Sequence, residues 1–318
     1  MQTVAVLGYY GQGNFGDDLI LEGLRTLFKG WEMQVYSTVT GGAYPTLDYN
    51  KANKSDLFIV GGGELIHKDC LAQPTPCRFK FKNHSLAYKL YNRTFLAHLP
   101  YLKHIKTRKV LLGCGVDAEE LNWNVKKDLQ QFSFIGLRDT TSMQTLKKIP
   151  ELTDKIHLFH DLAFQLTPPK PTKKSDYAAV IPTHREGLSL ESSEQWLKEN
   201  VTGYRKAWLI PFGKNDNDDY TTARVLSPTL FLAGVRSEFM LPSQVNFTAV
   251  CNLLSGAKEV FTYRLNGLIL AYMLGVPCRF YPYHPKLNRV HDTLTGVCPD
   301  VIRREQQKTL NIIMEGIN

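Results

Sequence analysis

The stretch Thr262-Tyr-Arg-Leu-Asn-Gly-Leu-Ile-Leu-Ala-Tyr-Met-Leu-Gly-Val-Pro277 decides the fold. Glu259–Tyr263 is rich in β-branched and aromatic residues, which predicts a short strand. Gly267–Leu274 is almost wholly apolar, which predicts a buried helix that ends at Gly275-Val-Pro277. Cys278–Tyr281 then predicts the next strand. The stretch is therefore a strand–helix–strand repeat of an α/β fold.

Arg264 lies where this strand passes into the helix. In open α/β sheets ligands bind at that edge, beside the free N–H groups of helix starts. A guanidinium there suits a phosphate or a carboxylate of a ligand. The alternative is a structural arginine that pairs with a core carboxylate, and the spacing alone leaves both interpretations open.

Two glycine-rich loops follow other predicted strands. Gly8–Asp18 comes after the strand Thr3–Leu7, and Gly61-Gly62-Gly63-Glu64 comes after the strand Ser55–Val60. Such loops permit tight turns and a close approach of backbone to a ligand. The acidic helix start at Asp17 disfavours a pyrophosphate and favours a hydroxyl-rich ligand such as a sugar, or it only caps the helix.

Arg138 is a second arginine at a predicted strand-to-helix junction, just before the helix Thr140–Lys148. If Arg138 and Arg264 point into one cleft, they can together hold a small dianion that carries a phosphate and a carboxylate. We therefore predict that these two side chains converge on one ligand.

The βα rhythm continues along the chain, with glycine at several strand ends, which is typical of parallel doubly wound sheets. The proline-rich segment 167–175 predicts a linker. We expect an α/β protein of two Rossmann-like domains facing a cleft, one at 1–166 and the other at 176–318. The last predicted helix, Val301–Glu315, is assigned to the second domain.

The composition sets further bounds. The 318 residues are 43% hydrophobic and 21% charged, with a formal net charge of +8. Residues 78–109 are locally basic, which suits an anionic membrane surface or an acidic substrate, or is only a solvated face. No motif supports nucleic-acid binding.

The six cysteines form no C-x-x-C pair, so we expect no zinc site. Because Met1–Leu7 runs directly into a strand, we expect no secretory signal and a cytoplasmic protein.

Five segments together resemble the polysaccharide pyruvyl transferase family, whose members look like GT-B proteins. They are Gly8–Leu21, Ser55–Leu65, Val110–Gly115, Ile135–Ser142 with His160–Phe164, and Tyr263–Lys286. The family transfers a pyruvyl group from phosphoenolpyruvate to two hydroxyls of a sugar, which gives a cyclic ketal and phosphate. That chemistry requires no cofactor, and because the sequence shows no metal-ligand spacing we expect no metal. The resemblance implies phosphoenolpyruvate as the donor. It also implies a sugar acceptor, and peripheral contact with the inner membrane face if that acceptor is lipid-linked.

The resemblance assigns the donor to the C-terminal domain and the acceptor to the N-terminal domain. It implies that the donor phosphate or carboxylate is held by Arg138 and Arg264, helped by Leu265, Asn266, Ser142, His284 and Lys286. The residues that it implies for the acceptor are Tyr9, Tyr10, Gly11, Asn14, Asp17, Gly62, Gly63 and Glu64.

One position departs from the family pattern. The family usually has Arg-Leu-His where this chain has Arg264-Leu265-Asn266, and that histidine is thought to protonate the methylene carbon of the donor. Asparagine does not titrate near neutral pH. Three explanations stay open: an engineered or natural impaired variant, another acid (Asp161, His160 or His284), or different donor chemistry. Two other functions are kept as alternatives, a nucleotide-sugar glycosyltransferase of GT-B type and a non-catalytic relative. The oligomeric state is not predicted.

Overall fold

The structure is a computed structural model, and it describes residues 1–38, 41–68, 101–183, 188–213 and 218–315. The predicted helix at 85–100 and most of the basic region 78–109 lie outside these residues. The chain divides into two compact units. Unit 1 comprises Met1–Gln12, Ile20–Gln165 and Asp300–Asn318, and unit 2 comprises Gly13–Leu19 and Leu166–Pro299.

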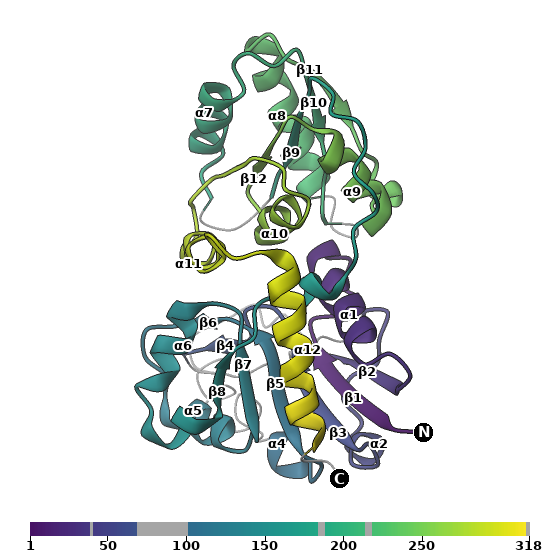
Figure 1. The fold of residues 1–318 in the computed structure, drawn as a ribbon. Helices are drawn as coiled ribbons and strands as arrows, with labels where there is room; N and C mark the ends of the chain where they lie inside the picture. The colour runs from purple at the N-terminus through teal and green to yellow at the C-terminus, as the bar shows by residue number, and fades with distance from the viewer. Residues whose placement is uncertain (39–40, 69–100, 184–187, 214–217, 316–318) are drawn as a thin grey trace, which may run out of the picture. The chain divides into compact units, whose positions relative to one another are not determined.

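Unit 1 is built on a parallel sheet of six strands (Figure 1). In spatial order the strands are β2 (Glu32–Ser37), β1 (Thr3–Gly8), β3 (Leu57–Gly61), β5 (Lys109–Cys114), β7 (Phe134–Leu137) and β8 (Ile156–Leu158). The four inner strands β1, β3, β5 and β7 are apolar and mostly buried, as expected for a parallel sheet covered on both faces.

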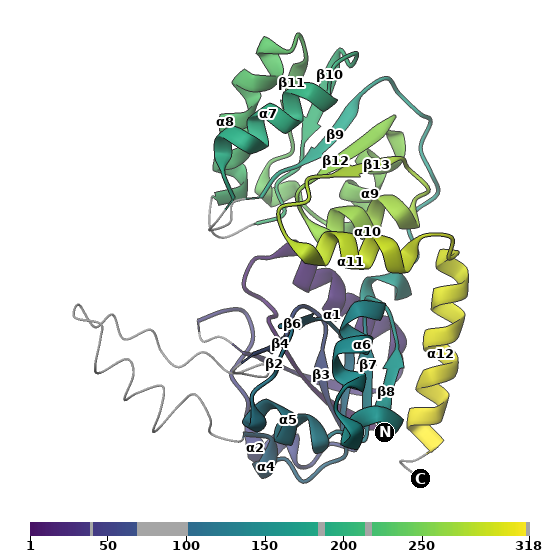
Figure 2. The same ribbon diagram turned by 90° about the vertical axis from the view of Figure 1, so that its left-hand side faces the viewer.

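Alternate residues of these strands enter two separate cores. Val4 and Val6 pack with helix α1 (Phe15–Leu27) and with Leu310 and Ile313 of α12 (Pro299–Glu315). Residues on the opposite face pack with α5 (Trp123–Gln130) and α6 (Thr140–Lys147). Figures 1 and 2 show α12 in yellow beside the unit 1 sheet. The shorter elements of unit 1 are α2 (Tyr49–Ala52), β4 (Ile66–His67), α4 (Tyr101–His104), β6 (Val116–Asp117), η1 (Pro150–Lys155) and η2 (Leu162–Gln165).

Unit 2 has a second parallel sheet, of five strands. In spatial order they are β11 (Arg236–Phe239), β10 (Lys206–Leu209), β9 (Ala178–Ile181), β12 (Glu259–Thr262) and β13 (Cys278–Phe280). Its helical elements are α7 (Leu190–Asn200), α8 (Asp218–Leu232), η3 (Pro242–Gln244), α9 (Phe247–Gly256), α10 (Leu265–Met273) and α11 (Pro285–Leu294).

The direction of chain winding reverses once in each sheet. The reversal lies between β1 and β3 in unit 1 and between β9 and β12 in unit 2. Ligands of open α/β sheets bind outside the carboxyl ends of the strands at such switch points. In unit 1 the two glycine-rich loops leave the strands that flank this point, and in unit 2 Arg264 follows β12.

The unit boundaries differ from the expected domains at two segments. Residues 300–318 belong to unit 1, because Leu310 and Ile313 pack in its core. Residues 13–19 belong to unit 2, where the Phe15 N–H donates to the Phe212 carbonyl at 2.8 Å. The described residues include no helix long and apolar enough to span a membrane.

Candidate active site

Arg264 is positioned by the backbone at the carboxyl end of β12. It occupies the N-cap position of α10 without giving that helix a side-chain cap bond. The Thr262 hydroxyl accepts from the Arg264 N–H at 2.9 Å and donates to the Arg264 carbonyl at 2.8 Å. This local clamp fixes the backbone from which the guanidinium extends.

The Arg264 guanidinium pairs with a carboxylate that sequence reasoning missed. Its Nη2 lies 2.6 Å from Asp219 Oδ1 and 2.5 Å from Oδ2. Asp219 is only 1% exposed, and its Oδ2 also accepts from the N–H groups of Phe212 and Gly213, at 3.2 and 2.8 Å. The pairing with a core carboxylate, one of the two interpretations left open above, is therefore present.

The rest of the guanidinium faces other groups of unit 2. Arg264 Nη1 donates to Asn14 Oδ1 at 3.4 Å, whereas the buried Nε makes no hydrogen bond to a described residue. Thr183, just beyond β9 on the other side of the switch point, is 1% exposed, and its hydroxyl also lacks a described partner. Buried polar atoms are normally hydrogen-bonded, so two such atoms at a switch point indicate a site for a polar ligand.

Asn14, Asp17 and Asn266 lie in the same unit as Arg264. Asn14 Nδ2 donates to Asp17 Oδ2 at 2.6 Å, and Asn14 Oδ1 accepts from the Gly16 N–H at 3.2 Å. Asn266 Nδ2 donates to the Gly16 carbonyl at 3.4 Å. A Cβ at position 16 would lie 2.4 Å from Asn266 Oδ1, so the glycine makes room for this amide. The expected place of Asn14 and Asp17 in the N-terminal domain is corrected, because both belong to unit 2.

Arg138 forms a second candidate anion site, in unit 1 at the carboxyl end of β7. The side chain is 4% exposed, and its Nη2 lies 3.2 Å from Glu64 Oε1. A Cβ at Gly115 would lie 2.7 Å from both Nε and Nη2, so the guanidinium covers this glycine. Arg138 and Glu64 were expected on different substrates, and the structure pairs them directly.

Three residues expected at the substrates are part of the protein core instead. Tyr10 is 1% exposed, and its hydroxyl donates to the Gly61 carbonyl at 2.6 Å, so it cannot stack on a sugar. Ser142 is fully buried, and its hydroxyl donates to Asp139 Oδ2 at 2.8 Å and accepts from the Val116 N–H at 3.0 Å. The Leu265 side chain is 5% exposed.

The glycines and Tyr9 of the predicted acceptor group lie on the loops at the unit 1 switch point. Tyr9 is 42% exposed. Gly11, Gly62 and Gly63 have φ near +70°, a conformation that favours glycine. A Cβ at Gly62 would also lie 2.1 Å from Ile20 Cγ2. Packing and backbone geometry therefore require glycine at 62, whether or not a ligand binds there.

The three candidate acids have different surroundings. Burial lowers the pKa of His160 to about 4, and its left-handed backbone (φ 59°) is held by Gln306, whose Nε2 donates to the Phe159 and Asp161 carbonyls at 2.6 and 3.1 Å. Burial raises the pKa of Asp161, partly offset by the nearby Arg138 guanidinium. His284 is the N-cap of α11, and its Nδ1 accepts from the N–H of the buried Lys286 at 3.3 Å.

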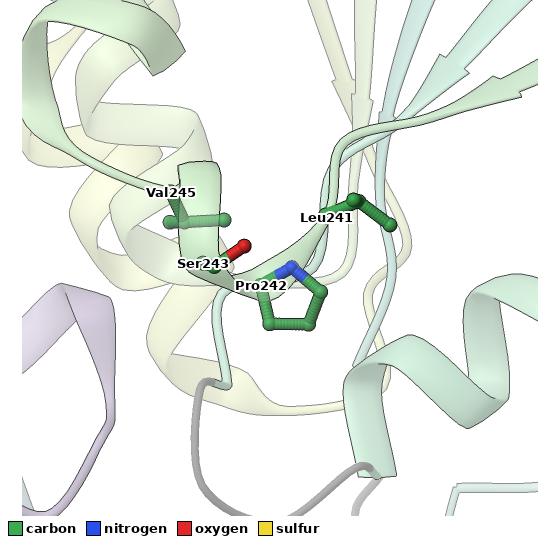
Figure 3. Close-up of a pocket in the computed structure, with 4 residues that line it drawn as sticks. All are labelled: Leu241, Pro242, Ser243 and Val245. Carbon is green, nitrogen blue, oxygen red and sulfur yellow. The ribbon is translucent and has the colours of Figure 1, made fainter.

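A hollow of about 540 Å³ lies at the carboxyl end of β11 in unit 2 (Figure 3). Leu241, Pro242, Ser243 and Val245 line it. A lining without a charged side chain does not suit a small anion, so we do not assign the donor to this hollow. The predicted convergence of Arg138 and Arg264 stays a prediction, because they belong to different units.

Comparison with known proteins gives one family whose model matches the sequence and several solved structures with a similar fold. The family model for polysaccharide pyruvyl transferase matches residues 14–285. No curated protein sequence gives a significant match. Solved structures with a similar fold include UDP-GlcNAc 2-epimerase from Methanocaldococcus jannaschii in complex with UDP-GlcNAc and UDP, at 12% identity, covering 99% of this chain and 100% of that chain, with a TM-score of 0.55.

Two others are a UDP-N-acetylglucosamine 2-epimerase from Rickettsia bellii (11% identity, 100% and 97% covered, TM-score 0.53) and S. aureus MnaA in a structure with UDP (11% identity, 96% and 91% covered, TM-score 0.52). Likeness at this level of identity concerns the fold alone. The chain has a GT-B-like fold of two Rossmann-like α/β domains, as expected.

Proposed function

Because the chain belongs to the polysaccharide pyruvyl transferase family, we propose that it transfers a pyruvyl group from phosphoenolpyruvate to a sugar of a polysaccharide or glycolipid precursor. In this reaction C2 of the donor forms bonds to two acceptor oxygens and loses its bond to the phosphate oxygen. C3 gains a proton and becomes a methyl group. The two hydroxyl protons balance the protonation of C3 and of the leaving phosphate, so the transfer needs no cofactor.

The observation that carries this proposal is Arg264 at the switch point of unit 2. Asp219 pairs with Nη2 of Arg264, whereas the buried Nε of Arg264 and the buried Thr183 hydroxyl both keep unused hydrogen-bonding capacity. An arginine fork suits the dense negative charge of the phosphoenolpyruvate phosphate. In the proposed roles Arg264 holds the donor, and Asn14 with Asp17 orients polar groups beside it.

Asn266 replaces the acid that the family resemblance implies. Its amide can hydrogen-bond the donor, but it supplies no proton near neutral pH. We therefore propose slow turnover, and we expect Asn266→His to raise kcat by about 10²- to 10⁴-fold, the usual contribution of a general acid. If kcat does not rise, another group supplies the proton. Asp161 is then the first to replace, because burial favours its protonated form.

The test is incubation with phosphoenolpyruvate and a panel of methyl glycosides, followed by proton NMR for a ketal methyl singlet and by a phosphate-release assay. We expect Arg264→Lys to lower kcat/KM by about 10- to 100-fold, because a lysine lacks the fork that makes charged hydrogen bonds of about 1.5–3 kcal/mol. Arg279→Lys is the matched control, since Arg279 on β13 is about half exposed and pairs with Glu259 on β12. A lack of ketal, phosphate release and donor binding in the wild type and in Asn266→His would refute the function.

We further propose that a lipid-linked acceptor brings the protein to an anionic membrane surface. The basic region 78–109, mostly outside the described residues, is the segment that suits such contact.

A further inference from the structure

The guanidinium of Arg138 lies above the ends of three adjacent strands of unit 1. Arg138 follows β7, Gly115 follows β5, and Glu64 follows β3, and these strands neighbour one another in that order. Nε, Nη2 and Cζ of Arg138 would all lie within 3 Å of a Cβ at Gly115. The missing side chain at 115 therefore leaves the space that this guanidinium occupies.

Two carboxylates of described residues lie within 4 Å of the Arg138 guanidinium, and the buried Asp161 is also close enough to interact with it electrostatically. Asp139 Oδ2 lies 3.9 Å from Nε, but Asp139 caps α6: its Oδ1 accepts from the Ser142 N–H at 2.7 Å and its Oδ2 from the Ser142 hydroxyl at 2.8 Å. Glu64 Oε1 lies closer, at 3.2 Å from Nη2. Glu64 is thus the nearer of the two carboxylates that lie within 4 Å of Arg138.

The contact with Glu64 leaves the hydrogen-bonding needs of Arg138 unmet. Although the side chain is 4% exposed, neither Nε nor Nη2 makes a well-aligned hydrogen bond to a described residue. These two nitrogens form the edge of a guanidinium that receives a carboxylate through two parallel bonds. Buried donors of this kind are normally satisfied, so this edge suits a carboxylate better placed than that of Glu64.

The backbone that carries Glu64 is anchored, so an exchange of carboxylates can take place by side-chain rotation. The Gly62 N–H donates to the Leu112 carbonyl at 2.8 Å, and the Gly115 N–H donates to the Gly63 carbonyl at 2.8 Å. Rotation about side-chain bonds moves a glutamate head group by several ångströms without backbone motion.

We propose that Glu64 is a built-in competitor for the Nε–Nη2 edge of Arg138, and that the carboxylate of the donor displaces it on binding. The proposal rests on the proposed function for the identity of the donor. It makes Glu64 a residue that limits donor affinity and selects for a planar carboxylate in unit 1. The phosphate of the donor then binds elsewhere.

The test compares Glu64→Gln with the wild type by isothermal titration with phosphoenolpyruvate and with pyruvate. We expect Glu64→Gln to bind phosphoenolpyruvate and pyruvate about tenfold more tightly, because the ligand no longer has to displace an ion pair. A tenfold change in affinity corresponds to about 1.4 kcal/mol. Glu64→Ala should show the same direction, which guards against a fold defect specific to one variant. Glu22→Gln removes the same charge from an exposed pair with Arg25 and should leave both affinities unchanged.

A double-mutant cycle places the effect at Arg138. In an Arg138→Ala background, Glu64→Gln should not alter either affinity. Weaker or unchanged binding by both Glu64 variants would overturn the proposal. So would a gain in affinity on Glu64→Gln that persists in the Arg138→Ala background.

The titration with pyruvate distinguishes this proposal from the proposed function, because pyruvate carries the carboxylate but cannot donate a pyruvyl group from an enol phosphate. If Glu64→Gln binds pyruvate more tightly but the protein forms no ketal, the proposed pyruvyl transfer is refuted and the proposed competition between Glu64 and a carboxylate is supported.

Discussion

At the scale of single residues, the ion pair of Arg264 and Asp219 has two roles that can be measured separately. It compensates the buried charge of the Asp219 carboxylate, and it positions the Arg264 guanidinium that the proposed reaction uses. Asp219 receives two backbone N–H groups in addition to Arg264, so its negative charge is well solvated by the protein. Removal of that charge leaves the buried arginine without compensation.

We expect Asp219→Asn to lower the free energy of unfolding by about 3 kcal/mol, as is typical when one member of a buried pair is removed. Urea denaturation followed by circular dichroism measures the change. Glu238→Gln is the control, because the pair of Glu238 with Lys206 is about one-third exposed and should cost less than about 1 kcal/mol. Equal losses in the two variants would contradict the buried character of the Asp219 pair.

His160 predicts a pH dependence of stability. Its pKa is about 4 in the folded protein and about 6.5 when unfolded, so between these values the unfolded state binds more protons. The free energy of unfolding therefore falls as the pH decreases from about 6.5 to about 4, by up to about 3 kcal/mol from this residue. The raised pKa of Asp161 acts in the opposite direction.

His160→Asn isolates this contribution, because asparagine tolerates a positive φ. The difference in unfolding free energy between wild type and variant should shrink or change sign across that pH window. A constant difference between pH 7 and pH 4 for His160→Asn would show that the imidazole does not remain neutral when folded.

At the scale of elements, α12 is tied to the strained turn of unit 1 by one buried amide. Gln306 is 1% exposed; it donates to the carbonyls on either side of His160 and accepts from Gln165 Nε2 at 2.7 Å. The helix thereby holds the segment that also carries Asp161.

Replacing Gln306 with leucine should lower the free energy of unfolding by about 3 kcal/mol, since it removes three hydrogen bonds from a buried network. Gln307→Leu is a matched control, because its neighbouring position on α12 is exposed. Chemical denaturation of both variants measures the contrast. Similar stabilities would mean that water replaces the lost bonds.

Elements with strong apolar patterns could be predicted from the sequence, and those with weak patterns could not. The strand, helix and strand around Arg264 are confirmed within two residues, because β-branched runs and a proline after glycine mark them clearly. β11 was missed, since its Arg-Ser-Glu-Phe sequence is that of a polar edge strand. α11 was not predicted, although Pro285 at its first position and the spacing of Leu287, Val290 and Leu294 are helix signals.

The candidate site shows the same division. Arginines and glycines at strand ends are visible in sequence, because each follows a recognisable strand. Their partners are not visible: Asp219 lies 45 positions before Arg264, and Glu64 lies 74 positions before Arg138, so only the sheet order brings them together. Tyr10 and Ser142 were misassigned because neither a loop sequence nor the first turn of a helix tells which side chains turn into the core.

At the scale of the whole molecule, the chain passes between the units more than once. Unit 1 is completed by residues 300–318, and unit 2 includes residues 13–19. The domains are therefore not separable at a single linker near residue 170, which is where the proline-rich segment suggests a cut.

We expect the fragment 1–165 to lack a cooperative thermal transition, because Leu310, Ile313 and Gln306 are missing from its core. Joining residues 299–318 to that fragment through a flexible Gly-Ser linker should restore the transition, measured by differential scanning calorimetry. Cooperative unfolding of 1–165 alone would show that α12 is dispensable.

The late position of α12 has a consequence for synthesis on the ribosome. The apolar face that Leu310 covers leaves the ribosome long before Leu310 is translated, since 145 residues separate positions 165 and 310. At 5–20 residues per second this interval lasts roughly 7 to 30 s. During this interval the nascent polypeptide exposes a hydrophobic surface that a chaperone can shield. Unit 1, whose synthesis begins first, is therefore completed last, when α12 has been translated.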